Sequence, residues 1–175
     1  MAGDFYLNVV DTKTGFVKGE SIDVTYTDEI QISNFSIGVR GPELSDEASA
    51  DSGHCDFEEA EFEMPASVAS SALFYLCCSG EILKTVTLTC RKGGGGGKPQ
   101  TFLQWRFHRA QISSYKMTPS DNDTPTETIR LKFAKLEIAY TRQKPDGTLE
   151  ATPHQSGWDQ DQNGSLKSTL PHPKK

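Results

Sequence analysis

The sequence has no long apolar stretch. No window approaches 18 consecutive apolar residues, so a transmembrane helix is excluded by length. The first residues, MAGDFYLNVV, place no basic region ahead of an apolar run, and we therefore expect no cleavable signal peptide. Together these absences predict a chain that is made and folded in the cytoplasm. If it is secreted, it must leave the cell by a route other than the general secretion pathway.

Positive charge is also scarce. The chain has 18 Lys and Arg against 24 Asp and Glu, which gives a net charge of −6 and a pI near 5.2. This balance argues against binding to nucleic acid, whose phosphates require a basic surface. It argues equally against anionic membrane surfaces. The acid is unevenly spread, because residues 43–63 carry nine Asp and Glu and neither Lys nor Arg.

Cysteine and histidine are few and badly spaced for chemistry. No two of the 4 cysteines form a C-x-x-C pair, and no histidine pairs with another metal ligand at the i, i+4 spacing. In a protein expected to fold in the cytoplasm, this predicts reduced, partly buried thiols and no metal site. The residues concerned are Cys55, Cys77, Cys78, Cys90, His54, His108, His154 and His172.

The sequence also lacks a complete catalytic motif. The stretch RKGGGGGKPQ at residues 91–100 resembles a phosphate-binding loop, but Lys92 stands where that motif needs glycine and Pro99 where it needs Ser or Thr. TFLQWRF, a strand pattern, follows where a helix should begin, so we predict a β-hairpin loop. Residues 121–123 start like a calcium loop, but the glycine and the closing glutamate of that motif do not follow them. His108 is predicted to lie on the surface and not to act as a catalytic base. We therefore predict no catalytic, cofactor-binding or metal-binding residue, and no enzyme activity.

Alternating apolar residues predict a mainly β protein with one helix. The alternation covers residues 5–10, 16–26, 29–39, 56–63, 82–90, 101–117 and 127–142. The helix is predicted from Pro65 to Ser79, with Gly80 as its C-terminal cap.

Three of the predicted strands change the face on which their apolar residues lie. The changes fall at residues 33–34, 109–110 and 134–135. Since a one-residue slip moves every side chain to the opposite face, each strand must bulge or bend there. We therefore predict strands that contribute to two curved sheets, forming a small closed β-barrel with one flanking helix.

The composition predicts a single domain over residues 1–164. An acidic loop insertion occupies residues 40–56, and a polar C-terminal tail follows at residues 165–175. Trp158 is large enough that we expect it to dock the C-terminal segment onto the barrel.

Four segments of the sequence form a recognisable pattern: KGES (18–21), LKTVTLTCRKGG (83–94), YKMTPSDNDTPTETIRLKFAKLEIAYTRQKPDGTL (115–149) and GWDQDQN (157–163). Their order and spacing resemble the haemolysin-coregulated protein (Hcp) family of type VI secretion systems. The resemblance covers residues 5–163, and its most specific part is the pattern I-x-L-x-F-x-K-L-x-x-x-Y from Ile129 to Tyr140. The chain differs from the common pattern in its long acidic insertion, its five-glycine run and its tail.

The resemblance implies a structural subunit of the secretion tube. Members of this family form rings of six subunits, and the rings stack into a hollow tube inside a contractile sheath. A spike protein tips the tube, which is expelled from the cytoplasm to the outside or into a target cell, and effectors can be held in the lumen. The resemblance implies no cofactor, no nucleic acid and no membrane insertion.

Stacked copies of an acidic chain repel one another, so local pairing must offset the repulsion. We hypothesise that the acidic residues of 43–63 on one ring meet basic residues such as Lys13, Lys18 or Lys92 on the next. The alternative function is a monomeric ligand-carrying β-barrel or binding module, which would require an apolar internal cavity.

Overall fold

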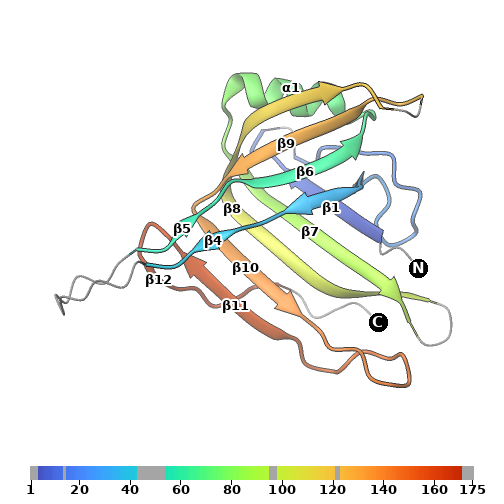
Figure 1. The fold of residues 1–175 in the computed structure, drawn as a ribbon, viewed down its shortest axis with the longest axis vertical. Helices are drawn as coiled ribbons and strands as arrows, with labels where there is room; N and C mark the ends of the chain where they lie inside the picture. Colours follow the sequence, from blue (N-terminus) through green and yellow to red (C-terminus); the bar gives the residue numbers. More distant parts are fainter. Residues whose placement is uncertain (1–3, 14, 43–53, 95–97, 121–122, 171–175) are drawn as a thin grey trace.

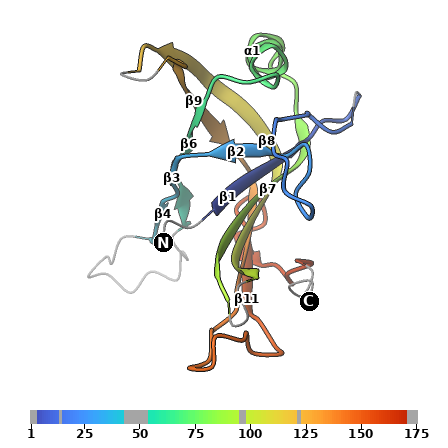
Figure 2. The ribbon, with the colours of Figure 1, turned by 90° about the vertical axis from the view of Figure 1, so that its right-hand side faces the viewer.

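The computed structural model describes residues 4–13, 15–42, 54–94, 98–120 and 123–170 (Figures 1 and 2). Strands dominate it, and one helix lies at one end of the molecule. The elements are β1 (Asp4–Val10), β2 (Ile30–Ile32), β3 (Asn34–Ser36), β4 (Val39–Arg40), β5 (Asp56–Phe57), β6 (Ala60–Pro65), α1 (Ser70–Ser79), β7 (Leu83–Gly93), β8 (Pro99–Thr118), β9 (Thr126–Lys132), β10 (Lys135–Tyr140), β11 (His154–Asp159) and β12 (Gly164–Ser165).

The long strand β8 belongs to both parts of the sheet. Its first half pairs with β7 and β10, as far as Ala110. From Gln111 onward it pairs with β9 instead. Arg109, between the two halves, adopts a left-handed backbone with φ 50°, a conformation that few residues other than glycine adopt. The predicted change of face at 109–110 is thus confirmed as the point where β8 changes partners.

The other two predicted changes of face are confirmed as well. Ser33 separates β2, which pairs with β1, from β3, which pairs with β6. Ala134 separates β9, which pairs with β6 and β8, from β10, which pairs with β8 and β11. Each break moves the chain from one branch of the sheet to the other.

The predicted closed barrel is not confirmed. Among the described residues the strands follow the order β12-β11-β10-β8-β7-β1-β2, and the branch β3-β6-β9 joins at β8. This ladder is open. Within the described ranges the two ends of this order, β12 and β2, do not pair with each other, and β4 and β5 pair with each other as a separate arm. Figure 2 shows the two branches diverging from β8.

Two element boundaries differ from the sequence prediction. Helix α1 begins at Ser70 rather than at Pro65, because Pro65 still pairs with Thr126 as the last residue of β6. The helix ends as predicted, with Gly80 in the left-handed conformation at φ 64°. The strand predicted over residues 16–26 is reduced to a single bridge between Val10 and Phe16.

The core lies between the two branches, under α1. Leu73 and Leu76 are the buried residues of the helix, which packs on β8. The Phe107 ring meets Phe62 and Phe133 edge to face, with ring centroids 5.8 and 4.9 Å apart. Such aromatic pairs add to the gain from burial. This cluster joins β6 of one branch to β8 at the junction of both.

The glycine run lies between two paired strands. β7 and β8 pair as far as Gly93, the first glycine of the run, and Pro99, which follows it. This confirms the predicted hairpin. A strand follows the run, where a phosphate-binding loop would be followed by a helix. Residues 95–97 lie outside the described part of the chain, as do residues 43–53 of the predicted acidic insertion and residues 121–122.

Candidate functional site

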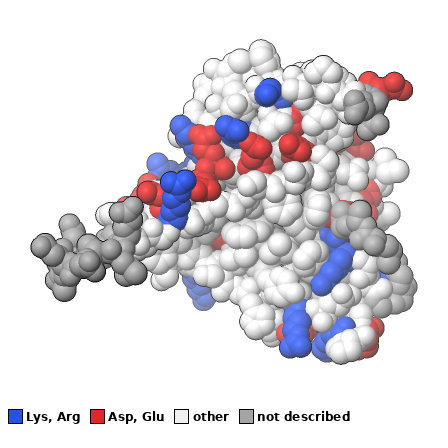
Figure 3. Space-filling view, in the orientation of Figure 1, with Lys and Arg blue, Asp and Glu red and all other residues white. Residues whose placement is uncertain are grey.

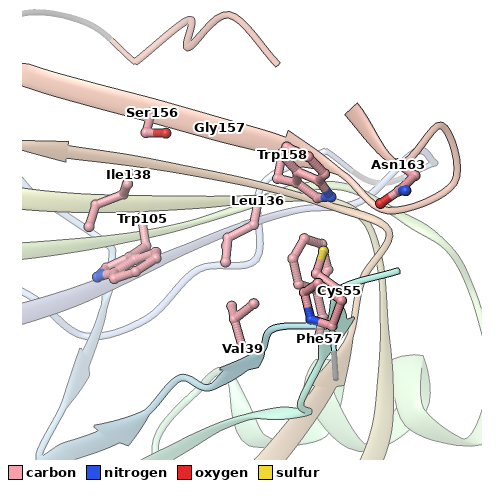
Figure 4. A pocket seen from close by; sticks show the side chains of 11 residues that line it. Val39, Cys55, Phe57, Trp105, Leu136, Ile138, Ser156, Gly157, Trp158 and Asn163 are labelled. Atoms are coloured by element: carbon pink, nitrogen blue, oxygen red, sulfur yellow. The ribbon is translucent and has the colours of Figure 1, made fainter. Parts of the chain in front are cut away.

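The candidate site is an apolar groove between the β4–β5 arm and the β10–β11 part of the sheet (Figure 4). Its volume is about 540 Å³. In the close-up, side chains from the sheet and from the arm face each other across the gap. The lining residues are Val39, Pro42, Cys55, Phe57, Trp105, Leu136, Ile138, Ser156, Gly157, Trp158 and Asn163.

The sheet side of the groove is built from two cross-strand rows. Ile138 pairs with Trp105 on β8 and with Ser156 on β11. Two residues along β10, Leu136 pairs with Phe107 and Trp158 in the same way. Because residues two apart on a strand share a face, both rows lie on the face that buries Phe107. The groove is therefore a continuation of the core that the chain's described residues leave uncovered.

The arm supplies the opposite side of the groove. Phe57 stacks on Phe133, with ring centroids 5.1 Å apart, which ties the base of the arm to the core. Arg40 and Glu58 form an ion pair at 2.8 Å across it. Val39, by contrast, is 50% exposed. The arm is thus held in place beside the groove without filling it.

Trp158 lies in β11 and forms part of the groove. The segment that follows it is docked on the sheet through backbone pairing of Trp158 with Ser165 in β12. Docking by the Trp158 side chain itself stays a prediction. The indole lines the groove, and its Nε1 is buried without a hydrogen-bond partner. A buried donor that lacks a partner costs free energy.

The described part of the tail packs on the sheet, which the sequence analysis missed. The Leu166 amide donates to the Gly157 carbonyl at 2.8 Å. Further along, Glu137 of β10 accepts hydrogen bonds from the Thr169 amide at 2.5 Å and from the Ser168 hydroxyl at 3.0 Å. Leu170 is buried. A carboxylate on the face opposite Leu136 and Ile138 ordinarily indicates a solvent-exposed face, so the sequence carried no signal that the tail would cover it.

Glu137 also explains His108, which was predicted to lie on the surface. His108 Nε2 lies 2.5 Å from Glu137 Oε1, and its side chain is only 25% exposed. Burial of Glu137 raises its pKa, but the bonds from Thr169, His108 and Ser168 outweigh burial and lower the pKa below its ordinary value. Glu137 is therefore held as a carboxylate that anchors the tail.

The acidic residues near the arm have basic partners in the same chain. Arg130 of β9 pairs with Glu61 of β6 at 2.7 Å. Lys132 of β9 pairs with Glu59, which directly precedes β6, at 3.5 Å. Figure 3 shows the resulting band of mixed charge over this part of the surface, beside a largely uncharged area.

The basic residues proposed to meet these acids also have partners within the chain. Lys13 pairs with Glu81 at 3.1 Å, Lys18 with Asp28 at 3.7 Å, and the Lys92 ammonium lies 4.6 Å from the centroid of the Phe102 ring. A contact with another copy would therefore have to compete with these partners.

The described residues lack two further features. They contain no group of three or more His, Cys, Asp or Glu side chains placed to hold a metal ion. They also contain no helix of the length and apolarity needed to cross a membrane.

The chain is similar to known secretion-system proteins over most of its length. A family model described as "Type VI secretion system effector, Hcp" matches residues 6–140. Protein hcp1 of Pseudomonas aeruginosa is 29% identical over 165 residues, covering 93% of this chain and 98% of that protein. A solved structure of a type six secretion system protein matches with a TM-score of 0.81 and 23% identity, over 94% of this chain and 100% of that one. The crystal structure of Hcp1 from Salmonella typhimurium matches with a TM-score of 0.73 and 21% identity, over 95% and 100%.

Proposed function

Since the chain belongs to the Hcp family of type VI secretion system proteins, we propose that it is the structural subunit of the secretion tube. In this proposal six copies form a ring and the rings stack. The family is one of secreted secretion-system proteins and is not a known enzyme family. We also propose that residues 1–164 act as one domain and that the protein has no catalytic, metal-binding or cofactor-binding residue.

The observation that carries the proposal is the uncovered apolar groove. It presents two tryptophans, Leu136 and Ile138 beside an arm with a half-exposed Val39. Contiguous apolar surface rimmed by polar residues marks an interaction site, and Trp is enriched at the centre of such sites. A ring closes when one patch of each copy meets a different patch of the next. The groove supports a role as one of these two patches.

The other partners follow from the proposed tube. A spike protein would sit at the tip, sheath proteins would surround the tube, and effectors would ride in the lumen. The subunit would reside in the cytoplasm until the tube is expelled. The open sheet is compatible with closure of the remaining edges by neighbouring copies, which is how the expected closed arrangement would arise in the ring.

Native mass spectrometry tests the proposal. We expect a species of six copies. In the Val39→Asp variant, we expect the protein concentration below which this species dissociates to rise by about tenfold or more. The reason is that a carboxylate buried without a partner costs more than the ~1.4 kcal/mol that a tenfold change represents. Met117→Asp is the control, because Met117 is 48% exposed but lies in the second half of β8, which pairs with β9 and does not line the groove. A wild-type protein that stays monomeric at every concentration contradicts the proposal.

The alternative function is a monomeric protein that carries an apolar ligand. The groove favours this alternative because its volume of about 540 Å³ lies within the range of small-molecule sites. The two functions differ in one measurement. A carrier stays monomeric and binds an apolar fluorescent probe saturably, whereas a ring subunit covers the groove and loses probe binding as it assembles.

A further inference from the structure

Two apolar side chains near the N-terminus are almost fully exposed. Ile22 is 96% exposed and Val24 is 97% exposed. They lie in the segment of residues 20–28, which we call the tip loop, between β1 and β2. Covering two such side chains together would remove apolar surface from water, which is favourable.

The tip loop is held by hydrogen bonds along its own backbone. The Ser21 amide donates to Glu29 O at 3.1 Å, and the Asp28 amide donates to Ser21 O at 2.9 Å. Asp23 Oδ1 accepts from the amides of Thr25 and Tyr26, at 2.9 and 3.2 Å. The loop therefore has one defined conformation from end to end.

A buried arginine clamps the loop to the sheet. Arg91 of β7 donates to Asp23 at 2.7 Å, to Asp4 at 3.2 Å and to the Tyr6 hydroxyl at 2.9 Å. Its guanidinium also lies about 5 Å from the Tyr6 and Tyr26 rings, which stack on each other. Cation–π contacts of this kind add to the ion pairs.

The clamp determines where the two apolar side chains point. Asp23 is drawn inward to Arg91, and its neighbours on either side, Ile22 and Val24, are consequently turned outward. The loop thus presents a fixed pair of apolar side chains, and little conformational entropy remains to be lost when a partner covers them.

The groove and the tip loop lie on opposite sides of the sheet. Figure 2 shows β4, which borders the groove, on one side and the blue chain between β1 and β2 on the other. A copy cannot fill its own groove with its own tip loop. Two different apolar patches on opposite sides of one molecule are what a head-to-tail contact between identical copies requires.

We propose that Ile22 and Val24 of one copy insert into the groove of a second copy, beside Trp105, Leu136 and Trp158. This inference rests on the proposed function and names the contact through which the copies meet. Pairing an apolar knob with an apolar groove removes both from water, and the Arg91 clamp keeps the knob in position.

A cross-linking experiment tests the pairing, because the groove contains a native thiol. Ile22→Cys is made in a background carrying Cys77→Ser and Cys78→Ser, which removes the other accessible thiols. Under mild oxidation of the assembled protein, position 22 should form a disulfide with Cys55 of a neighbouring copy, giving a ladder of linked chains. Adding Cys55→Ser should abolish the ladder. Thr25→Cys, on the same loop, should give at least tenfold less product.

A second variant measures the strength of the contact without adding a thiol or a charge. Ile22→Thr/Val24→Thr keeps the β-branched shape while replacing apolar methyl groups with hydroxyls. We expect the concentration for assembly to rise at least tenfold, with the thermal unfolding midpoint unchanged because both side chains are exposed. Thr25→Ser is the matched control and should assemble as the wild type does.

The outcomes separate this inference from the proposed function. The pairing stands if the linked ladder forms and the double variant assembles more weakly. If six-copy rings form at wild-type strength in the double variant, or if no ladder forms, the pairing is overturned and the tube function remains. If the wild-type protein does not assemble at any concentration, both are overturned.

Discussion

At the scale of single residues, Arg91 is the side chain on which the most contacts depend. Its side chain is only 7% exposed and pairs with Asp4 and Asp23. The pKa of Asp23 illustrates the effect: burial raises it, but the bond to Arg91 and two backbone amides lower it overall. Nothing in the strand LKTVTLTCRKG singles this arginine out, since its two partners come from distant parts of the chain.

We predict that Arg91→Met lowers the free energy of unfolding by about 2–3 kcal/mol, because it leaves partly buried carboxylates without their charged donor. Arg142→Met is the control. Arg142 is 71% exposed and lies 3.9 Å from Glu150, and such surface pairs contribute less than about 1 kcal/mol. Urea denaturation measures the free energy of unfolding of both variants. Equal losses in the two variants would show that the clamp adds no stability beyond an ordinary surface pair.

At the scale of elements, the strand breaks were predictable and the strand partners were not. The apolar phase changes at 33–34, 109–110 and 134–135 are local features of the sequence, and each became a real break. The start of α1 was misplaced because Pro65 suits both a first helical turn and the end of a strand, and here it is the last residue of β6. Residues 16–26 alternate like a strand, but Arg91 holds part of this segment in a loop.

The candidate site was only partly visible in the sequence for the same reason. Trp158 was identified, and its segment is docked on the sheet. The groove itself arises where Leu136 meets Trp158 across β10 and β11, and where the arm returns beside them. The arm residues lie far along the chain from β10 and β11, and no local pattern encodes such pairings.

The tail is an element whose attachment should depend on pH. The Glu137 carboxylate has a pKa below its ordinary value of 4.5. Its contribution to docking is thus complete above 4.5 and is lost as the pH falls through the lowered value. We predict that the Thr169 amide resonance, hydrogen-bonded to Glu137 at neutral pH, shifts toward its unfolded position on acidification from about pH 7 to about pH 3.

Two variants check the cause of this pH dependence. Glu137→Gln removes the titrating group, so the Thr169 resonance should be displaced at neutral pH and should change little on acidification. Glu61→Gln alters a distant carboxylate that pairs with Arg130, and the wild-type titration should persist. A wild-type pH dependence of the Thr169 resonance in Glu137→Gln would contradict the prediction, because the effect would then come from another group.

At the scale of the whole molecule, repulsion between like charges opposes assembly, whereas burial of apolar surface favours it. The chain carries −6, and the described acids near the arm pair with Arg40, Arg130 and Lys132 of the same chain. If copies meet through apolar patches, added salt weakens only the repulsion between them. We predict that assembly strengthens several-fold between about 10 mM and about 100 mM salt, as the screening length falls from about 30 to about 10 Å.

Light scattering over a dilution series at each salt concentration measures this dependence. A neutral osmolyte at matched water activity is the control, since it leaves charge interactions unscreened. Assembly that weakens as salt is added would favour the other arrangement, in which acids of residues 43–63 on one ring pair with lysines on the next.

The bend in β8 has one more consequence. Both branches of the sheet are anchored on this one strand, the first half of which carries β7 and β10 and the second half β9. If β8 loses its pairing, both branches lose the strand that joins them. We therefore expect neither branch to unfold independently of the other. A subunit driven through a narrow passage would therefore resist as one mechanical unit up to a single threshold, and then yield completely.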